Sequence, residues 1–445
     1  MVSYEEKKRL LSEQLRAGAD SAIGLNKEQS NLFRDRKDRP GHRLDVSRLD
    51  QVLQVDVAQG WVEVEGMTPY EKLVAATLPH GVMPTVVPEL KSITIGGAVS
   101  GIGIESSSFK YGMVHETVLA MDVLLSDGSV VTCTADNDYR DLFFGIPNSY
   151  GTLGYVLKLK VKTVAVEPYV ELRHSRYRDA ATFFQELAEH CQRKEADFID
   201  GTVFAPDELY LTLGRWVATA PFTSDYTYKQ IYYRSIRQKE RDYLTTLDYI
   251  WRWDTDWFWC SRNLYVQNPL LRRLVGKRRL NSVSYTKVMR WNSRWQLTKR
   301  LNRLLGIHTE SVIQDVDIPV AGAPEFLDFF QREIGVTPIW ICPAQAYDPA
   351  VRFPLFALQP GTLYVNFGFW DVVKSRQPQP PGYYNRNIER KVAELGGIKS
   401  LYSDAFYPPD EFWRHYDQTA YAGLKAKYDP QGRFKDLYQK TVLRE

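Results

Sequence analysis

The sequence predicts an α+β fold whose second half builds a large antiparallel sheet. Two stretches of that half, beginning near residues 169 and 310, share one order of elements: strand, helix, strand, strand. Before residue 168 the chain is rich in strands with short helices between them. Such segregation is typical of α+β domains, whereas a parallel sheet needs regular strand–helix alternation. With 445 residues, the chain is long enough for two domains, one of them split by the other.

In the first part, residues 44–66 alternate polar and apolar side chains around a turn at 58–60, which predicts a strand hairpin. The next stretch predicts a helix, with Thr68 as N-cap, Pro69 in the first turn and Gly81 just past the end. A second hairpin is expected to turn at Asp127-Gly128, and residues 150–168 end in a strand.

The second half contains the two similar units. In the first unit, strands are expected at 169–177, 198–206 and 208–217 around a helix at 179–196; in the second, strands at 310–320, 338–345 and 361–370 around a helix at 321–335. Together the units predict one α+β domain with a large antiparallel sheet. A further helix is expected at 385–397.

Composition excludes several classes of protein. Apolar residues make up 44% of the chain, including 11 Trp, 27 Tyr and 20 Phe, and indicate well-filled cores. The formal net charge of +3 gives no reason to expect a nucleic-acid partner. The four cysteines lie far apart without metal-ligand spacing, so we expect reduced thiols and no metal site.

The N-terminal residues are charged and helix-like, and no apolar run approaches 18 residues. A signal peptide needs an apolar central region, and a membrane-spanning helix needs about 20 apolar residues. We therefore expect a cytoplasmic protein that contacts the inner face of the membrane at most peripherally.

Residues 251–309 form an unusual segment between the two units. From Trp257 to Thr309 it has twelve Lys or Arg and no Asp or Glu, and six tryptophans lie in or beside it. Basic and tryptophan side chains together are typical of a segment that docks on an anionic lipid surface. The alternative is a solvated helical hairpin whose tryptophans belong to the core.

The stretch IGGAVSGIGIESSSFKYG (95–112) carries five glycines and three consecutive serines around Glu105. Glycine allows a close approach of backbone to a ligand. A dinucleotide fingerprint would need a third glycine at position 106, and a helix does not follow the GIG motif, so a Rossmann fold is not expected. We expect a loop that approaches a ligand.

This stretch, with its flanking motifs, resembles one known family. VVPELKSITIGGAVSGIGIESSSFKYG (86–112), SDGSVVTC (126–133) and DLFFGIPNSYGTLGY (141–155) look like the FAD domain of the vanillyl-alcohol-oxidase/PCMH flavoproteins. Within that superfamily the chain resembles the Δ24-sterol reductase branch, on the motifs GIESSS, GTLG, PIWICP (338–343) and LYSDAFYPPDEFW (401–413). That branch includes bacterial reductases of methylene-branched fatty acyl chains, which the segment 391–407 resembles most.

The resemblance implies a PCMH-type, two-subdomain FAD-binding domain at residues 1–167. It implies a substrate-binding cap at 168–395, with the basic segment as an insertion, and a C-terminal segment, 396–445, that returns to the flavin. No histidine lies in the loop 25–34, where many members attach FAD covalently, so we expect non-covalent FAD. That loop also lacks the glycines common in the superfamily.

The resemblance also implies the residues that contact FAD. The candidates are Ser30, Asn31, Pro88, Gly96, Gly97, Ser100, Gly101, Gly103, Ser106, Ser107, Gly151, Thr152, Leu153 and Gly154. Backbone N–H groups and close main-chain approach suit a pyrophosphate and a flavin ring. The aromatic residues Trp340, Tyr347, Phe367, Phe369 and Trp370 are candidates for an apolar substrate channel, although as strand residues they can equally be core.

Reduction of an isolated carbon–carbon double bond needs a hydride at one carbon and a proton at the other. Candidate proton donors are Glu105, Tyr402 and Asp404, and Lys399 is a candidate to neutralise charge near the flavin. For Glu105, a role as a cofactor contact is the alternative. A buried carboxyl group in an apolar pocket has a raised pKa, which suits proton donation.

The function that follows is FAD-dependent reduction of a lipid carbon–carbon double bond, with NADPH as the co-substrate. The lipid is a methylene-branched acyl chain or a sterol side chain. The alternative enzyme is a flavin oxidase or dehydrogenase of an alcohol or hydroxy acid. A third hypothesis is a membrane-bound lipid-binding protein with a vestigial flavin.

Overall fold

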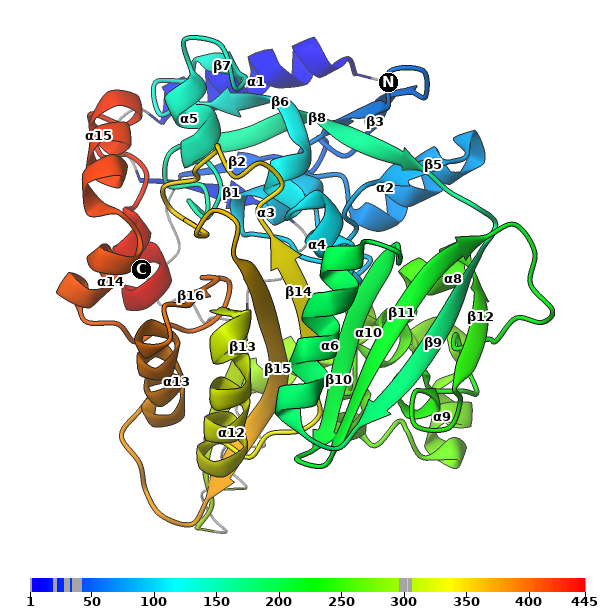
Figure 1. The fold of residues 1–445 in the computed structure, drawn as a ribbon. Coiled ribbons are helices and arrows are strands. Elements are labelled where there is room, and N and C mark those ends of the chain that lie inside the picture. The colour runs from blue at the N-terminus through cyan, green and yellow to red at the C-terminus, as the bar shows by residue number, and fades with distance from the viewer. Residues whose placement is uncertain are drawn as a thin grey trace.

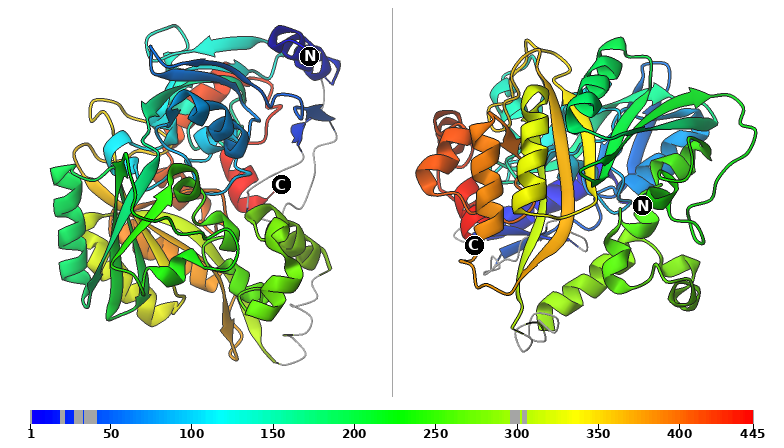
Figure 2. Two further views of the ribbon diagram at one scale, coloured as in Figure 1. Left: turned by 90° about the vertical axis from the view of Figure 1, so that its right-hand side faces the viewer. Right: turned by 60° about the horizontal axis from the view of Figure 1, so that its bottom comes forward.

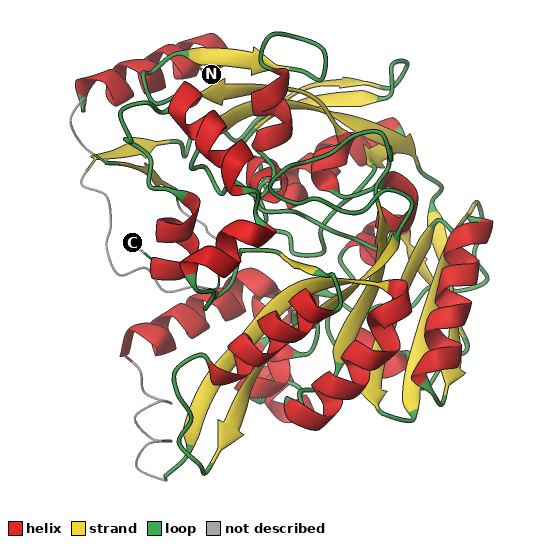
Figure 3. Cartoon of the chain, turned by 60° about the vertical axis from the view of Figure 1, so that its left-hand side comes forward, coloured by secondary structure: helices red, strands yellow, loops and turns green. Residues whose placement is uncertain are grey.

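The computed structural model describes residues 2–18, 22–27, 33, 42–295, 302 and 306–444. Two sheets lie in separate halves of the molecule, with helices and loops between them (Figures 1 and 3). One sheet has six strands and the other has eight. In addition, β1 and β2 form a separate parallel pair. This architecture confirms the predicted α+β class.

The first half contains the six-stranded sheet, in the order β3-β4-β8-β6-β7, with β5 paired to β8. Its elements are α1 (Tyr4–Ala17), β1 (Ile23–Asn26), β2 (His42–Asp45), β3 (Val52–Asp56), β4 (Trp61–Glu65), β5 (Val82–Pro84), β6 (Val118–Leu124), β7 (Val130–Cys133) and β8 (Tyr155–Ala165). Both predicted hairpins form, β3-β4 and β6-β7, and Gly128 has the positive φ of 83° that its tight turn requires.

The helices of this half differ from the prediction in two details. In α2 (Tyr70–Thr77) the N-cap is Pro69 rather than Thr68, whose hydroxyl donates instead to the Gln51 carbonyl oxygen. The glycine stretch is not a continuous loop, because α3 (Ile95–Ser100) and α4 (Ser108–Tyr111) form within it. α5 (Arg140–Gly145) precedes the GTLG motif.

The second half contains the eight-stranded antiparallel sheet, in the order β12-β9-β11-β10-β14-β15-β13-β16. Its elements are β9 (Tyr169–Tyr177), α6 (Ala180–Arg193), β10 (Phe198–Ala205), β11 (Glu208–Val217), β12 (Arg241–Thr245), β13 (His308–Pro319), α12 (Ala323–Glu333), β14 (Ile339–Gln345), β15 (Leu363–Ser375) and β16 (Ile398–Lys399). The two predicted units form, and they meet where β10 pairs with β14. Outward from that seam, the first unit continues with β11 and β9, and the second unit continues with β15 and β13.

The two faces of this sheet differ in chemistry. One face is apolar and is covered by α6, α12 and α13 (Tyr383–Glu394) (Figure 1); its core includes Phe367 and Phe369, which are therefore core residues rather than channel residues. The opposite face, called here the inner face, shares a core with the first half through Trp340, Cys342 and Trp370. Because side chains alternate along a strand, residues two apart share a face.

α8 (Thr246–Ile250) precedes segment 251–309, which itself forms short helices that include α9 (Pro269–Val275) and α10 (Ser282–Trp295). Four of the tryptophans, Trp251, Trp253, Trp257 and Trp259, are buried in the main core, so the interfacial interpretation was wrong for them. Trp291 is exposed. The Trp295 side chain lies outside the described residues. In Figure 2 the green helices α9 and α10 project from the body of the molecule.

The C-terminal segment runs back to the first half. After β16 come α14 (Pro409–His415) and α15 (Gln418–Tyr428), and α15 packs beside α5 (Figure 1). Arg433 donates to the carbonyl oxygens of Leu15 and Gly18, both at 2.8 Å. Chain ends more than 400 residues apart are thereby joined.

Candidate active site

The inner face of the eight-stranded sheet and the glycine stretch lie against each other. The Ile199 amide on β10 donates to the Ser106 carbonyl oxygen at 2.8 Å, and Lys110 pairs with Asp197 at 3.1 Å. On the other side, Asn148 donates to the Leu355 carbonyl oxygen at 2.7 Å. These contacts define the junction between the halves, where the glycine stretch and the residues around GTLG lie.

The glycines of the stretch pack closely against the chain itself. A Cβ at position 96 would lie 2.7 Å from the Gly66 carbonyl oxygen. One at position 103 would lie 2.7 Å from the Val114 side chain and 3.2 Å from Pro88. Internal packing therefore already requires Gly96 and Gly103, whatever they contact in a ligand. Gly97 is exposed and Gly101 half-buried.

The candidate hydroxyl groups donate within the protein. Ser100 donates to the Gly96 carbonyl oxygen at 2.8 Å, Ser107 to that of Thr85 at 2.8 Å, and Thr152 to that of Ser149 at 2.8 Å. Their oxygens retain lone pairs that can accept a hydrogen bond from a ligand. Ser30 and Asn31 lie outside the described residues.

The segment around GTLG, residues 151–154, is buried and adopts backbone conformations that favour glycine. Gly151 has a φ of 74° and Gly154 a φ of 158°, and a Cβ at Gly154 would lie 2.5 Å from the Val123 side chain. Leu153 is fully buried in the core. Just before the motif, Tyr150 bonds the glycine stretch twice, from its amide to the Ser100 carbonyl oxygen and from its hydroxyl to that of Gly101, both at 3.2 Å.

Glu105 is buried and paired. Its Oε1 accepts from the Ser106 hydroxyl at 2.6 Å and from Arg252 at 3.1 Å. The same guanidinium donates to Asp200 of β10 at 2.7 Å and lies 4.1 Å from the centre of the Tyr249 ring. Both roles predicted for Glu105, cofactor contact and proton donor, stay predictions, and the structure adds that its carboxyl group forms a buried ion pair with Arg252.

Other buried carboxyl groups surround this ion pair. Glu89 is in hydrogen-bonding contact with Glu105, and burial together with that neighbouring charge raises the pKa of Glu89 well above its usual range. Burial also raises the pKa of Asp200, although Arg252 opposes the shift. The thiol of Cys342 on β14 has a pKa raised by burial and by the neighbouring carboxylates. Asp317 of β13 is the weakest of those neighbouring charges.

Tyr402 lies at the other end of the inner face. Its hydroxyl oxygen accepts from the Trp370 indole at 3.0 Å, and its side chain is in hydrogen-bonding contact with Asp315 of β13. The Phe33 amide donates to the Tyr402 carbonyl oxygen at 3.0 Å. Phe33 belongs to the segment 25–34 that the resemblance assigns to the cofactor, so Tyr402 contacts one described residue of that segment.

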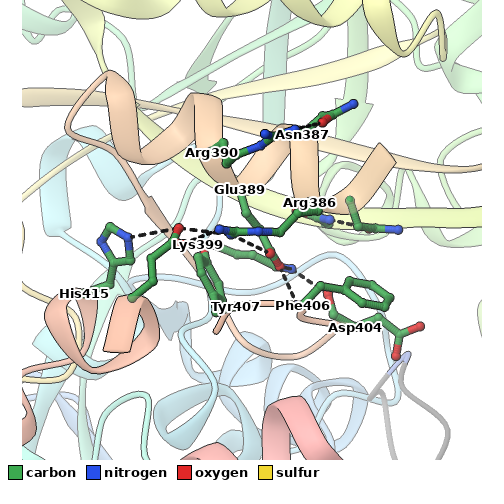
Figure 4. A network of polar contacts seen from close by, with 12 residues as sticks. Arg386, Asn387, Glu389, Arg390, Lys399, Asp404, Phe406, Tyr407 and His415 are labelled. Atoms are coloured by element: carbon green, nitrogen blue, oxygen red, sulfur yellow. Dashed lines mark hydrogen bonds and ion pairs between the residues drawn. The ribbon is translucent and has the colours of Figure 1, made fainter. Parts of the chain in front are cut away.

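Lys399 and Asp404 lie in a separate polar network (Figure 4). The fully buried Lys399 ammonium group pairs with Glu389 at 3.0 Å and donates to the Asp404 carbonyl oxygen at 2.5 Å. The Asp404 carboxylate faces Arg444 at 3.5 Å. The charge of Lys399 is thus matched by Glu389, and the Asp404 carboxylate has a cation of its own.

Sequence reasoning missed Glu89, Asp200, Arg252, Asp315 and Asp317. A signal for three of them was present, because FIDGTVF (198–204) and VIQDVDIPV (312–320) place acids inside otherwise apolar strands. Buried carboxyl groups are rare unless paired or functional. Arg252 has no comparable signal, since it lies in a tryptophan-rich turn, WRWD, whose burial only the fold reveals.

The junction has features that fit a flavin cofactor. Buried polar atoms there have no partner within the described residues: Asn148 Oδ1, Ser149 Oγ, Asn366 Oδ1 and Ser403 Oγ. A flavin offers ring carbonyl oxygens, ring nitrogens and ribityl hydroxyl groups, which can pair with such atoms. Buried polar atoms in folded proteins normally have partners, so these orphaned atoms indicate a polar ligand.

Comparison with known proteins gives the class. Residues 28–134 match the family described as "FAD binding domain". The chain is therefore an FAD-dependent oxidoreductase with a PCMH-type FAD-binding domain.

The relatives refine this assignment and confirm the resemblance to the Δ24-sterol reductase branch. The chain is 27% identical to Delta(24)-sterol reductase of Homo sapiens over 412 residues, which cover 90% of this chain and 77% of the relative. It is 25% identical to Delta(24)-sterol reductase of Pisum sativum, over 89% of this chain and 76% of the relative. A shorter match, 32% identity over 178 residues, relates 38% of this chain to 33% of cytokinin dehydrogenase 7 of Oryza sativa subsp. japonica.

Two further findings concern membranes and metals. Among the described helices, none combines the length and apolar character that crossing a membrane requires. Within the same part of the chain, no group of three or more His, Cys, Asp or Glu side chains has metal-binding geometry.

Proposed function

We propose that this protein reduces a carbon–carbon double bond of a lipid, with electrons from NADPH passing through FAD. The observation that carries the proposal is the inner face, where Tyr402 and buried carboxyl groups lie among tryptophans opposite the FAD-binding half. The names of the relatives support a sterol side chain as substrate. The motif resemblance supports a methylene-branched acyl chain equally well.

The surroundings of Tyr402 suit an apolar substrate. Trp370 packs against Phe258, with ring centres 4.2 Å apart, and Trp340 packs against the same ring at 5.6 Å. An alkene has no carbonyl group for the protein to polarise, so the protein must position it and supply a proton. When bound, FAD supplies the hydride; the chain supplies the apolar wall, excludes water and holds the proton on the Tyr402 hydroxyl group.

The cofactor contacts remain those that the motifs suggest, within the proposed FAD domain of residues 1–167 and cap of 168–395. Asn148 and Ser149 join the candidates because their side chains have orphaned atoms beside GTLG. We also propose that FAD is bound non-covalently. Heating the purified protein should then release its yellow colour into the supernatant.

Anaerobic reduction of the bound flavin tests the function. NADPH should bleach the flavin absorbance, and adding a methylene-branched acyl lipid or a Δ24 sterol should restore it, with the saturated lipid as product. Mass spectrometry of that product decides between the two lipids. Bleaching by an alcohol or hydroxy acid instead of NADPH would support the oxidase alternative, and purified protein without flavin would support the lipid-binding one.

The substrate is insoluble in water, and one surface of the chain suits lipid. The lipid-facing surface, as we call it, lies on α9, α10 and the turns beside them. Its exposed apolar residues are Tyr265, Leu270, Leu271, Leu274, Val288 and Trp291, and its exposed basic residues are Arg273, Lys277, Arg278, Arg279 and Lys287. Leu274 is 81% exposed and Leu270 is 73% exposed. We propose that this surface docks on anionic lipid.

Replacing Arg273, Lys277, Arg278 and Arg279 with glutamine should weaken binding to vesicles containing anionic lipid about a thousand-fold, since each basic residue near such a surface contributes about 1 kcal/mol. Arg272 does not belong in this set, because it is buried in an ion pair with Asp256 at 2.7 Å. Vesicle co-sedimentation measures the effect.

The matched control neutralises four arginines that are exposed elsewhere: Arg193, Arg215, Arg237 and Arg332. Net charge changes equally in both variants, so a loss confined to the first indicates a local surface. Equal losses would contradict docking through α9 and α10.

A further inference from the structure

Two aspartates on β13, the partly buried Asp315 and the buried Asp317, have been given no step in the reaction so far. Both side chains lie on the inner face, two positions apart on one strand. Asp317 accepts a hydrogen bond from Asn366 at 3.1 Å. Asp315 Oδ1 is buried and has no partner among the described groups. An unpartnered carboxyl oxygen on the wall of an active site needs an explanation.

Asp315 is built into contact with Tyr402. The sheet register places Asp315 opposite Gly368, where a Cβ would lie 2.9 Å from Asp315 Oδ1 and 2.6 Å from the Trp370 ring. The missing side chain at Gly368 therefore leaves room for the carboxyl group and the indole together. The Trp370 indole donates to the Tyr402 hydroxyl oxygen at 3.0 Å, and the Asp315 carboxyl group lies near enough to that hydroxyl group to raise its pKa.

The surroundings keep Asp315 protonated at neutral pH. Burial and the neighbouring Asp317 raise the pKa of Asp315 to about 8, and burial raises the pKa of Asp317 to about 7. The Tyr402 hydroxyl opposes the shift at Asp315. On β16, Lys399 turns its ammonium group to Glu389 and does not pair with these acids. No cation among the described residues pairs with Asp315 or Asp317.

Tyr402 alone would be a poor proton donor. Burial and the nearby Asp315 and Tyr150 groups raise the pKa of Tyr402 well above its usual range, because a phenolate is costly to form in such a site. A tyrosine that gives up a proton here needs one in return at the same time.

We propose that Asp315 is a positioning residue for the proposed reaction, supplying its proton to Tyr402 as Tyr402 protonates the lipid alkene. This inference rests on the proposed function. One alkene carbon gains a hydride from reduced flavin and the other gains the Tyr402 proton, so two electrons and two hydrogens are added and the carbon–carbon bond becomes single. The Asp315 proton passes to the Tyr402 oxygen, the charge rests on the Asp315 carboxylate, and solvent restores that proton before the next turnover.

Infrared spectroscopy tests the pair without turnover. The holoenzyme at pH 6.5 should show a protonated-carboxyl C=O band that disappears in Asp315→Asn. The Asp315 band should shift in Tyr402→Phe, because the carboxyl group loses the Tyr402 hydroxyl group as its partner. The Asp317 band, identified by its loss in Asp317→Asn, should not shift in Tyr402→Phe. The proposal is overturned if no band disappears in Asp315→Asn. It is also overturned if no protonated-carboxyl band of the wild type shifts in Tyr402→Phe, a comparison that needs only the wild type and the phenylalanine variant.

Turnover as a function of pH tests the role in the reaction. Wild-type turnover should fall as pH rises through about 8, where Asp315 loses its proton. Asp315→Asn should lower turnover about a hundred-fold and remove this limb, because loss of acid–base assistance costs about 10²–10⁴-fold. Asp317→Asn, the matched control on the same strand, should retain a limb but at lower pH, because Asp317 no longer raises the pKa of Asp315. A wild-type rate and limb in Asp315→Asn would overturn the proposal.

Failure of the proposed function gives a different result. NADPH should bleach the flavin of Asp315→Asn as fast as that of the wild type, since the acid is needed only when the lipid is reduced. If NADPH fails to bleach even the wild type, the proposed function is wrong. The shift of the carboxyl band in Tyr402→Phe then still decides whether Asp315 is hydrogen-bonded to Tyr402.

Discussion

Replacing Arg252 with methionine is expected to lower the free energy of unfolding by about 3–5 kcal/mol at pH 7, because it leaves buried carboxyl groups without their cation. Arg252 is 3% exposed and donates to both Glu105 and Asp200. The side chain also stacks on Tyr249, and methionine replaces part of that packing. Urea denaturation followed by tryptophan fluorescence measures the loss.

The pH dependence identifies the cause of that loss. Arg252 opposes the rise in the pKa of Asp200, so its removal raises that pKa further. A carboxyl group whose pKa is higher in the folded than in the unfolded state destabilises the fold as pH rises above the unfolded value of about 4. The deficit should therefore grow from pH 5 to pH 8.

The matched control is Arg237→Met, which removes an exposed ion pair with Glu208 at 2.8 Å. Such surface pairs contribute about 0–1 kcal/mol. Equal losses in the two variants, or a deficit of the Arg252 variant that is independent of pH, would contradict a buried charge cluster.

Much of the fold could be predicted because its signals are local. The hairpins at β3-β4 and β6-β7 follow from alternation and turn residues, and the two strand–helix–strand–strand units follow from successive local patterns. The order of strands in the large sheet could not be predicted in this way. The seam between β10 and β14 joins residues about 140 apart, and no local pattern specifies such a pairing.

Segment 251–309 shows why composition alone could not separate buried from exposed side chains. Its tryptophans and basic residues were grouped as one interfacial surface, but the structure separates them. Trp253 and Trp259 are almost fully buried, and Arg272 forms a buried ion pair with Asp256. Three of the six exposed apolar residues are leucines of α9. Which side of a short helix faces the core depends on tertiary packing, and short helices have too few turns to display it.

The candidate site shows the same limit. Motif resemblance indicated Glu105 and Tyr402 singly, but not their partners, because Arg252 and Asp315 come from segments far away in the chain. Glu105 illustrates the consequence. The resemblance indicated its carboxyl group alone, whereas the fold joins that group to the Arg252 guanidinium in a buried ion pair.

Tyr402→Phe is expected to lower turnover of the lipid alkene by about 10²–10⁴-fold, the usual effect of losing a general acid. The substitution removes one oxygen atom that contacts Trp370 and Asp315 and keeps the ring that packs 5.8 Å from Phe33. The free energy of unfolding should change by about 1 kcal/mol, because the Trp370 indole loses its acceptor. Steady-state product analysis and urea denaturation measure the two effects.

The control for this variant is Tyr407→Phe, which removes a hydroxyl group that is also buried but packs among His415 and Tyr416 rather than against Asp315. It should leave turnover near the wild-type value. In both variants NADPH should still bleach the flavin, since neither hydroxyl group takes part in that half of the reaction. If the Tyr402→Phe protein folds, is bleached by NADPH and turns over within a few-fold of the wild type, the proton comes from another group. The next residue to replace would then be Glu89, a buried carboxyl group with a raised pKa beside the glycine stretch.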